Sequence, residues 1–365
     1  MSLPPEVCAL ICKQPSLHRK DLRSLCSVSA SFRAEAERLL YTHVCLRSLR
    51  HIRSWCVSLA TRPHLAARVL FLSLSMPSSF DLAAADYSLL LYALGACSNL
   101  KDLHFLCDGR SPEGDATQIL FLEGHPWQLL KFTNSYFNPA LLRFFFESQP
   151  SMQTLVIRAR EYESPKPVYL PRNLTTLDTS AAVLRSVANA SGLRVRRLQY
   201  HMAQTRGVDE LPTFVALARL SHSLTTLSIV RHGIDEGMDV AVVAACIAAQ
   251  LPRLRYFRLM DNTIRSQDSL VPLLPFSINF EHIETFIIKP ATRLHEDDDI
   301  LRCVYRELDT EHGRSNAAMR IMQNLPTLSF LSFVLDHDYA FERIDGDVIV
   351  SLGIINLDSN NWMEA

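Results

Sequence analysis

The sequence predicts an α/β repeat protein, in which short parallel strands alternate with helices along most of the chain. Three observations predict this fold class: a leucine-rich, glycine-poor composition, a recurring apolar triplet, and helical stretches between its copies. Leucine supplies 55 of the 365 residues and glycine only 11. Scarce glycine leaves few places where a backbone can cradle phosphates, and no dinucleotide-binding, Walker-type or nucleophile-elbow motif occurs. The composition therefore argues against a nucleotide-binding enzyme.

The first 45 residues predict three short helices. A proline pair followed by glutamate suits the first turn of the first helix, and apolar residues then follow at helical spacing. A second helix is expected over residues 21–27 with Asp21 as its N-cap, and a third from Ser29 to Tyr41. Three short helices bury little surface alone, so we expect them to complete their core against a neighbour.

These helices carry a recognisable set of residues. It reads Leu3-Pro4-x-Glu6, then Asp21-Leu22-x-x-Leu25-x-x-Val28-Ser29-x-x-Phe32, then Leu40-Tyr41-x-x-Val44. The pattern resembles an F-box, in particular the fungal-type variant whose third helix ends in Leu-Tyr. The resemblance implies binding to the Skp-type adaptor of an SCF-type cullin–RING ubiquitin ligase. The adaptor-binding residues that it implies are Leu3, Pro4, Glu6, Val7, Ile11, Leu22, Leu25, Val28, Phe32, Leu40 and Tyr41. The alternative is a plain helical cap for the remainder of the chain.

The rest of the chain carries an apolar triplet at positions 1, 4 and 6. Several copies come after a short polar or proline turn, and most copies lie about 21 to 31 residues apart, near the interval of leucine-rich repeats. The copies are Val69/Leu72/Leu74, Leu100/Leu103/Phe105, Trp127/Leu130/Phe132, Met152/Leu155/Ile157, Leu174/Leu177/Thr179, Val195/Leu198/Tyr200, Leu224/Leu227/Ile229, Leu254/Phe257/Leu259, Ile283/Phe286/Ile288 and Leu328/Leu331/Phe333. Asn262 is the best candidate for the later consensus asparagine of such a repeat.

Helices are expected between the copies, over residues 81–96, 138–149, 235–251 and 299–325. The sequence therefore predicts a leucine-rich-repeat solenoid, with short parallel strands on its concave face and helices on its convex face. The expected divisions are an F-box over 1–45, a linker helix within 46–64, about ten irregular repeat units over 65–336, and a cap or tail over 337–365. A globular α/β domain is the alternative to the solenoid.

Charge and cysteine content indicate which kinds of partner and which cellular compartment the chain suits. The formal net charge is −1, but residues 1–64 carry about +6 and the remainder about −7, so the two parts suit different partners. Nine scattered cysteines without a CxxC pair indicate reduced thiols. The first residues lack a basic stretch followed by an apolar one, so no signal peptide is expected, and no run of 18 apolar residues occurs. We expect a cytoplasmic or nuclear protein that binds neither membrane nor nucleic acid.

Candidate chemical sites in the sequence are weak. The run from His295 to Asp299 predicts a solvated loop, because adjacent ligands point in diverging directions. The segment Asp336-His337-Asp338 predicts a surface turn, and the arginines from Arg47 to Arg53 predict a solvated helix face. No metal ligands, cofactor or catalytic residues are therefore expected, although a hydrolase-like enzyme with an unrecognised site stays an alternative.

The concave face of the expected solenoid is the better candidate for a binding site. Positions 3, 5 and 7 of the repeats would project from it, including Asp102, Lys131 and Asp178. The residues predicted to bind a client are Arg158, Arg197, His201, Tyr256, Arg258 and Lys289. This mildly basic face suits an acidic or phosphorylated segment of an unknown client, unless these are ordinary exposed strand residues. The expected function is client recognition for an SCF-type ligase, without enzymatic activity; the alternative is a repeat scaffold with no ligase link.

Overall fold

The computed structural model describes residues 3–76, 84–107, 116–157, 166–203, 207–234, 238–265, 273, 280–294, 301–344, 348–357 and 361–364. Across these described ranges the chain has an α/β fold with a mostly parallel sheet of 15 strands and flanking helices. It divides into two compact units, Met1–Ala159 and Arg160–Ala365. The division falls inside the region that the sequence predicts as one repeat array.

Three helices open the first unit: α1 (Pro5–Cys12), α2 (Arg19–Leu25) and α3 (Ala30–Thr42). The third helix was expected to begin at Ser29; Ser29 is the N-cap of α3, and its hydroxyl accepts a hydrogen bond from the Phe32 amide. The prediction for α2 was wrong at its start. His18 is the N-cap, and Asp21 lies at the third helical position, where its carboxylate accepts from the His18 amide at 2.8 Å.

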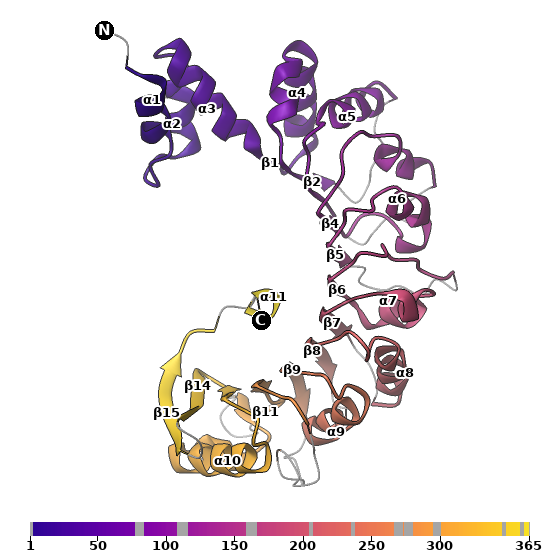
Figure 1. Ribbon diagram of the computed structural model, residues 1–365, viewed down its shortest axis with the longest axis vertical. Helices are drawn as coiled ribbons and strands as arrows, with labels where there is room; N and C mark the ends of the chain where they lie inside the picture. The colour runs from indigo at the N-terminus through magenta and orange to yellow at the C-terminus, as the bar shows by residue number, and fades with distance from the viewer. Residues whose placement is uncertain are drawn as a thin grey trace. The chain divides into compact units, whose positions relative to one another are not determined.

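Strands and helices alternate through the rest of the first unit. They are β1 (His43–Leu46), α4 (Leu49–Thr61), β2 (Phe71–Met76), α5 (Ala84–Ala96), β3 (Asp102–Cys107), β4 (Lys131–Asn134), α6 (Arg143–Glu147) and β5 (Thr154–Ile157). Neighbouring strands are parallel. The helices α4, α5 and α6 lie on one side of these strands, as Figure 1 shows, which leaves the other face of the sheet free of them.

Some expectations for the first unit need correction. β1 was not predicted. The Trp127/Leu130/Phe132 triplet is out of register by two residues: Phe132 pairs with Leu103, so Leu129 takes the buried first position and Leu130 is 43% exposed. The helix expected over 138–149 is a 3-10 turn (Pro139–Leu141) followed by the short α6.

The second unit repeats the same alternation. Its elements are β6 (Thr176–Ser180), α7 (Ala181–Ser186), β7 (Arg197–Ala203), α8 (Gly207–Ala218), β8 (Thr226–Ile234), α9 (Val240–Gln250), β9 (Tyr256–Arg265), β10 (Thr285–Lys289), α10 (Glu311–Asn324) and β13 (Phe330–Val334). The fourth and sixth triplet positions pair in register from β7 to β13 and are buried. The two pairing rows are Leu198–Leu227–Phe257–Phe286–Leu331 and Tyr200–Ile229–Leu259–Ile288–Phe333.

The end of the second unit differs most from expectation. The helix predicted over 299–325 is instead β12 (Leu301–Cys303), a 3-10 helix (Arg306–Asp309) and α10; β12 pairs antiparallel with β11 (Thr292–Leu294). The helix starts late because Thr310 is its N-cap. The expected cap or tail contains the antiparallel strands β14 (Asp338–Ile344) and β15 (Val348–Ile355) and the short helix α11 (Asn361–Glu364).

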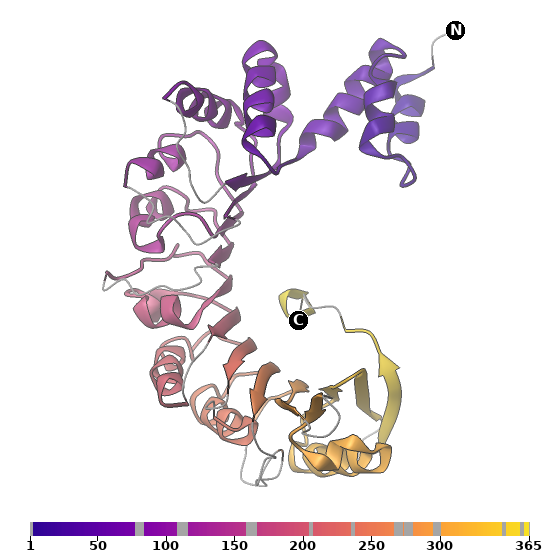
Figure 2. The ribbon, with the colours of Figure 1, turned by 180° about the vertical axis from the view of Figure 1, so that it is seen from behind.

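The two faces of the sheet in the second unit carry different elements. Helices α7, α8 and α9 lie on one face, whereas α11 lies on the other, as Figures 1 and 2 show from opposite sides. α11 contacts β7 and β8. We call the face opposite α7–α9 the open face, and the side chains that strands β6 to β13 direct to it form the candidate client site.

Candidate functional site

The three N-terminal helices form a small core of their own. Its buried residues are Cys8, Cys12, Leu22, Phe32 and Ala36. Of the residues that the F-box resemblance implies, Leu22 and Phe32 are therefore interior. Three others, Ile11, Leu25 and Leu40, pack partly buried against this core. Tyr41 is half-buried, and burial raises the pKa of its hydroxyl.

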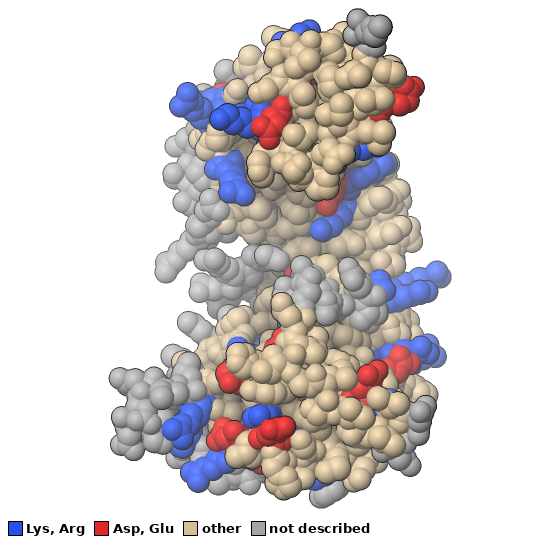
Figure 3. Space-filling view, turned by 90° about the vertical axis from the view of Figure 1, so that its left-hand side faces the viewer, with Lys and Arg blue, Asp and Glu red and all other residues tan. Residues whose placement is uncertain are grey.

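The remaining residues implied by the resemblance are on the surface. Leu3, Val7 and Val28 are 37–62% exposed, and Pro4 and Glu6 are exposed as well. Figure 3 shows the surface of these helices at the top of the view, mostly uncharged with scattered Lys and Arg. Leu3, Val7 and Val28 are therefore accessible for apolar contact with a partner.

The open face of the second unit carries a polar row that crosses four strands. Asp178, Gln199, Ser228 and Arg258 occupy paired positions on β6, β7, β8 and β9. The Ser228 hydroxyl donates to Gln199 Oε1 at 3.0 Å. His201 Nε2 lies 3.1 Å from Asp178 Oδ1 and 3.2 Å from Gln199 Nε2. This connected row can present fixed hydrogen-bonding groups to a bound segment.

Positively charged groups flank this polar row. Lys289 donates to Asn262 Oδ1 at 2.7 Å, so Asn262 lies on the open face and is no buried repeat asparagine. The rings of His201 and His232 are parallel, with centroids 6.4 Å apart. Partial burial lowers the pKa of His232, and His201 and Lys289 lower it further. Arg197 is half-buried on the same face.

Two of the predicted client-binding residues need separate comment. Arg158 lies outside the described residues. Tyr256 is on the open face, but it is buried in a cluster with Ile287 and Trp362, and burial raises the pKa of its hydroxyl to about 12. The surface around Tyr256 is therefore occupied by the last helix of the same chain.

The helix-free face of the first unit carries a smaller polar group. Asp102 Oδ1 lies 2.9 Å from His104 Nε2, and Asp102 Oδ2 lies 3.8 Å from Lys131 Nζ. The Phe71 ring packs edge-on against His104 and stacks on His43. These rings contact one another across three neighbouring strands, so this face offers aromatic as well as charged contacts.

Sequence reasoning missed a buried ion network beneath the open face. Arg231 donates to Glu210 Oε1 at 2.6 Å and to Asp261 Oδ2 at 2.9 Å, and all three are buried. Thr263 donates to the same aspartate at 2.6 Å. Burial raises the pKa of Glu210 above its usual value, and the positive charge of Arg231 offsets part of this rise. The only signal in the sequence is a charged residue two places after an apolar strand position.

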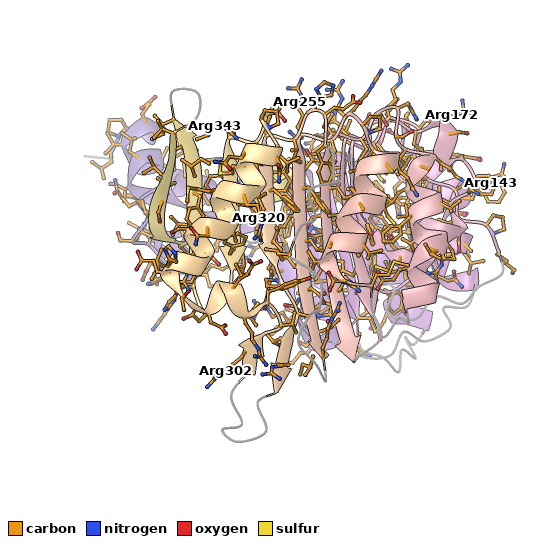
Figure 4. All side chains as sticks on the ribbon, turned by 90° about the horizontal axis from the view of Figure 1, so that it is seen from below. Arg143, Arg172, Arg255, Arg302, Arg320 and Arg343 are labelled. Atoms are coloured by element: carbon orange, nitrogen blue, oxygen red, sulfur yellow. The ribbon has the colours of Figure 1, made fainter. Side chains whose placement is uncertain are left out.

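A row of exposed arginines was also missed. In Figure 4, Arg172 and Arg255 project from the edge where the strands of the second unit begin, and Arg302 projects from the opposite edge. Arg253 donates to the His222 carbonyl at 2.9 Å, and Arg255 lies 3.4 Å from Glu284. The exposed arginines near this edge are Arg172, Arg194, Arg196, Arg219, Arg253 and Arg255.

The weaker chemical candidates gain little from the geometry. The run from His295 to Asp299 lies outside the described residues. Asp336 and His337 are exposed in a turn, where Tyr339 donates to Asp336. Within the described ranges, no three histidine, cysteine, aspartate or glutamate side chains are grouped to hold a metal ion.

Comparison with known proteins identifies no family for this chain. In the part of the chain that the structure describes, no helix has the length and apolarity needed to cross a membrane. The chain matches no protein-family model, and no curated protein gives a significant match to its sequence.

Proposed function

We propose that this chain is the substrate-recognition subunit of an SCF-type ubiquitin ligase. Its N-terminal helices, interpreted as an F-box, bind a Skp-type adaptor, and its repeat strands, interpreted as a leucine-rich-repeat solenoid, bind a client. The chain performs no chemistry itself. It raises the effective concentration of the client near the ubiquitin-loaded partner through two binding surfaces.

The exposed apolar surface of α1–α3 carries this proposal. The residues implied by the F-box resemblance separate into an interior set and an exterior set. Leu22 and Phe32 hold the helices together, whereas Leu3, Val7 and Val28 face solvent. Burying these exposed side chains against an adaptor would supply the apolar contact that the small core leaves unused.

The in-register rows of buried apolar side chains support the repeat interpretation. Each strand from β7 to β10 presents the same two triplet positions to the core beneath the helices. Stacked repeats bury in this way what a single unit cannot bury alone. The opposite, open face then presents Arg197, His201, Arg258 and Lys289, which suit an acidic client segment.

Direct binding of the full chain to a purified Skp-type adaptor tests the ligase role. We expect a stable complex by size-exclusion chromatography and a Leu3→Ala/Pro4→Ala variant that binds much more weakly. Truncating central apolar contacts typically costs about 2 kcal/mol or more, which is about 30-fold in Kd. Phe144→Ala removes an apolar side chain from α6 that is more exposed than Leu3 (70% against 49%) and should bind like the wild type.

Failure of the folded full chain to bind the adaptor would overturn the ligase role. The chain would then be an interaction scaffold that uses the same repeat strands. A weakened Phe144→Ala variant would also count against the proposal, because the loss would no longer be specific to the N-terminal helices.

A further inference from the structure

The helix α11 covers part of the open face of the second unit. Trp362, on this helix, is fully buried. Its side chain packs with Tyr256 of β9 and Ile287 of β10, and Phe330 and Val334 of β13 border the cluster. A single tryptophan therefore occupies an apolar site built by three parallel strands.

The segment before α11 is attached to the same unit. The Leu357 amide donates to Asp338 Oδ2 at 2.9 Å, and Leu357 and Met363 pack partly buried against the Trp362 cluster. The segment is held to the face by the buried Trp362, by the partly buried Leu357 and Met363, and through one helix of four residues, Asn361–Glu364. So short a helix has little stability of its own and depends on its docking.

Polar groups at this site lack hydrogen bonds. Trp362 Nε1 and Tyr256 Oη, in the cluster, and Ser332 Oγ, which pairs with Ile287 on the neighbouring strand, are buried and have no hydrogen-bond partner among the described residues. A segment that hydrogen-bonds to these groups would make contacts that the docked Trp362 does not make, so a competing segment has bonds to gain here.

Charge indicates the chemistry of the replacing segment. Residues 356–365 contain Asp358 and Glu364 and no lysine, arginine or histidine. The face beneath presents Arg258, which pairs with Ile287 on the neighbouring strand, and Lys289. Lys289 lies two positions from Ile287 on the same face of β10. The site therefore combines an apolar pocket with a basic border.

We propose that the pocket formed by Tyr256, Ile287, Phe330 and Val334 binds an acidic client segment that contains a tryptophan, and that Trp362 occupies the pocket in cis until such a client displaces it. The proposal rests on the client-binding role proposed for the open face and names the chemistry of the client.

The expected effect of the cis segment follows from effective concentration. A short tether gives an effective concentration of about 1 mM. For an isolated segment with a Kd of about 0.1 mM, the closed form would then outnumber the open form about tenfold. A client or peptide would bind the full chain about tenfold more weakly than a chain whose pocket is empty.

Fluorescence anisotropy with a labelled peptide of residues 356–365 tests this. The peptide should bind a Trp362→Ala chain about tenfold more tightly than the wild-type chain, and a chain that ends at Ile355 should behave like Trp362→Ala. A peptide with alanine in place of its tryptophan should lose binding to all three. Arg258→Glu, added to Trp362→Ala, should weaken binding without removing the apolar pocket.

Equal binding by the wild-type and Trp362→Ala chains would overturn the proposal, as would absence of binding by either emptied chain when circular dichroism shows it folded. Adaptor binding by the Trp362→Ala chain separates the two proposals. Peptide binding without adaptor binding would retain the pocket and reject the ligase role, and adaptor binding without peptide binding would do the reverse.

Discussion

Replacing Arg231 with methionine should destabilise the second unit strongly. Arg231 is 2% exposed and bridges Glu210 and Asp261, which are 1% and 0% exposed. Methionine fills much of the same volume but removes the cation, so two buried carboxylates would remain beside each other. The change therefore tests electrostatics with little loss of packing.

The magnitude depends on the groups that remain around each carboxylate. Breaking a buried ion pair by removing one partner costs about 3–5 kcal/mol. Asp261 keeps a hydrogen bond from Thr263 at 2.6 Å and has Arg265 at 3.6 Å, so it is partly compensated. We therefore expect about 3 kcal/mol for Arg231→Met, mainly from Glu210, which is a large share of a typical folding free energy of about 5–15 kcal/mol.

Urea denaturation followed by circular dichroism measures this loss. The matched control is Arg143→Met, which removes an exposed pair with Glu147 on α6 and should cost no more than about 0.5 kcal/mol. Glu210→Gln in the Arg231→Met background should recover part of the stability, because it removes the uncompensated charge. A loss below about 1 kcal/mol for Arg231→Met, or no recovery in the double variant, would refute the reasoning.

The pH dependence gives the same test a second readout. Burial raises the pKa of Glu210, so the folded chain holds this proton more tightly than the unfolded chain. The corresponding stability is present below the unfolded pKa of about 4.5 and is lost as pH rises through the folded pKa. The stability of the wild type relative to Glu210→Gln should therefore fall with rising pH. Arg231→Met should extend this fall to higher pH, because Arg231 opposes the shift.

Other predictions concern single positions. Gly313→Ala should destabilise the chain by about 1–3 kcal/mol, because the added Cβ would overlap a backbone carbonyl of the 3-10 helix before α10. Thermal unfolding measures this loss. The control is Gly192→Ala, whose added Cβ meets open space and should change stability little. Iodoacetamide at about pH 8 should label exposed Cys45 in the native chain and spare Cys56 and Cys97, whose pKa burial raises to about 12. Early labelling of Cys97 by mass spectrometry would contradict its burial.

The strands could be predicted because their signal is local and repeated. A strand buried on one face must place apolar residues two apart, and Leu227 with Ile229 or Phe257 with Leu259 satisfy this without reference to the rest of the chain. The error at β4 shows the limit of this signal. Leu129 and Leu130 are both apolar, and only pairing with the preceding strand decides which of them is buried.

The candidate site was predictable only in part, because its form depends on contacts between distant residues. Alternation along β9 places Tyr256 on the open face, but nothing near it in the sequence indicates that Trp362 covers it. Arg231, Glu210 and Asp261 likewise come from three separate elements, and each alone would be expected at the surface. Local patterns indicate which face a side chain takes, whereas its partner depends on long-range packing. Tyr256 could therefore be assigned to the open face from the sequence, and the segment that packs over it could not.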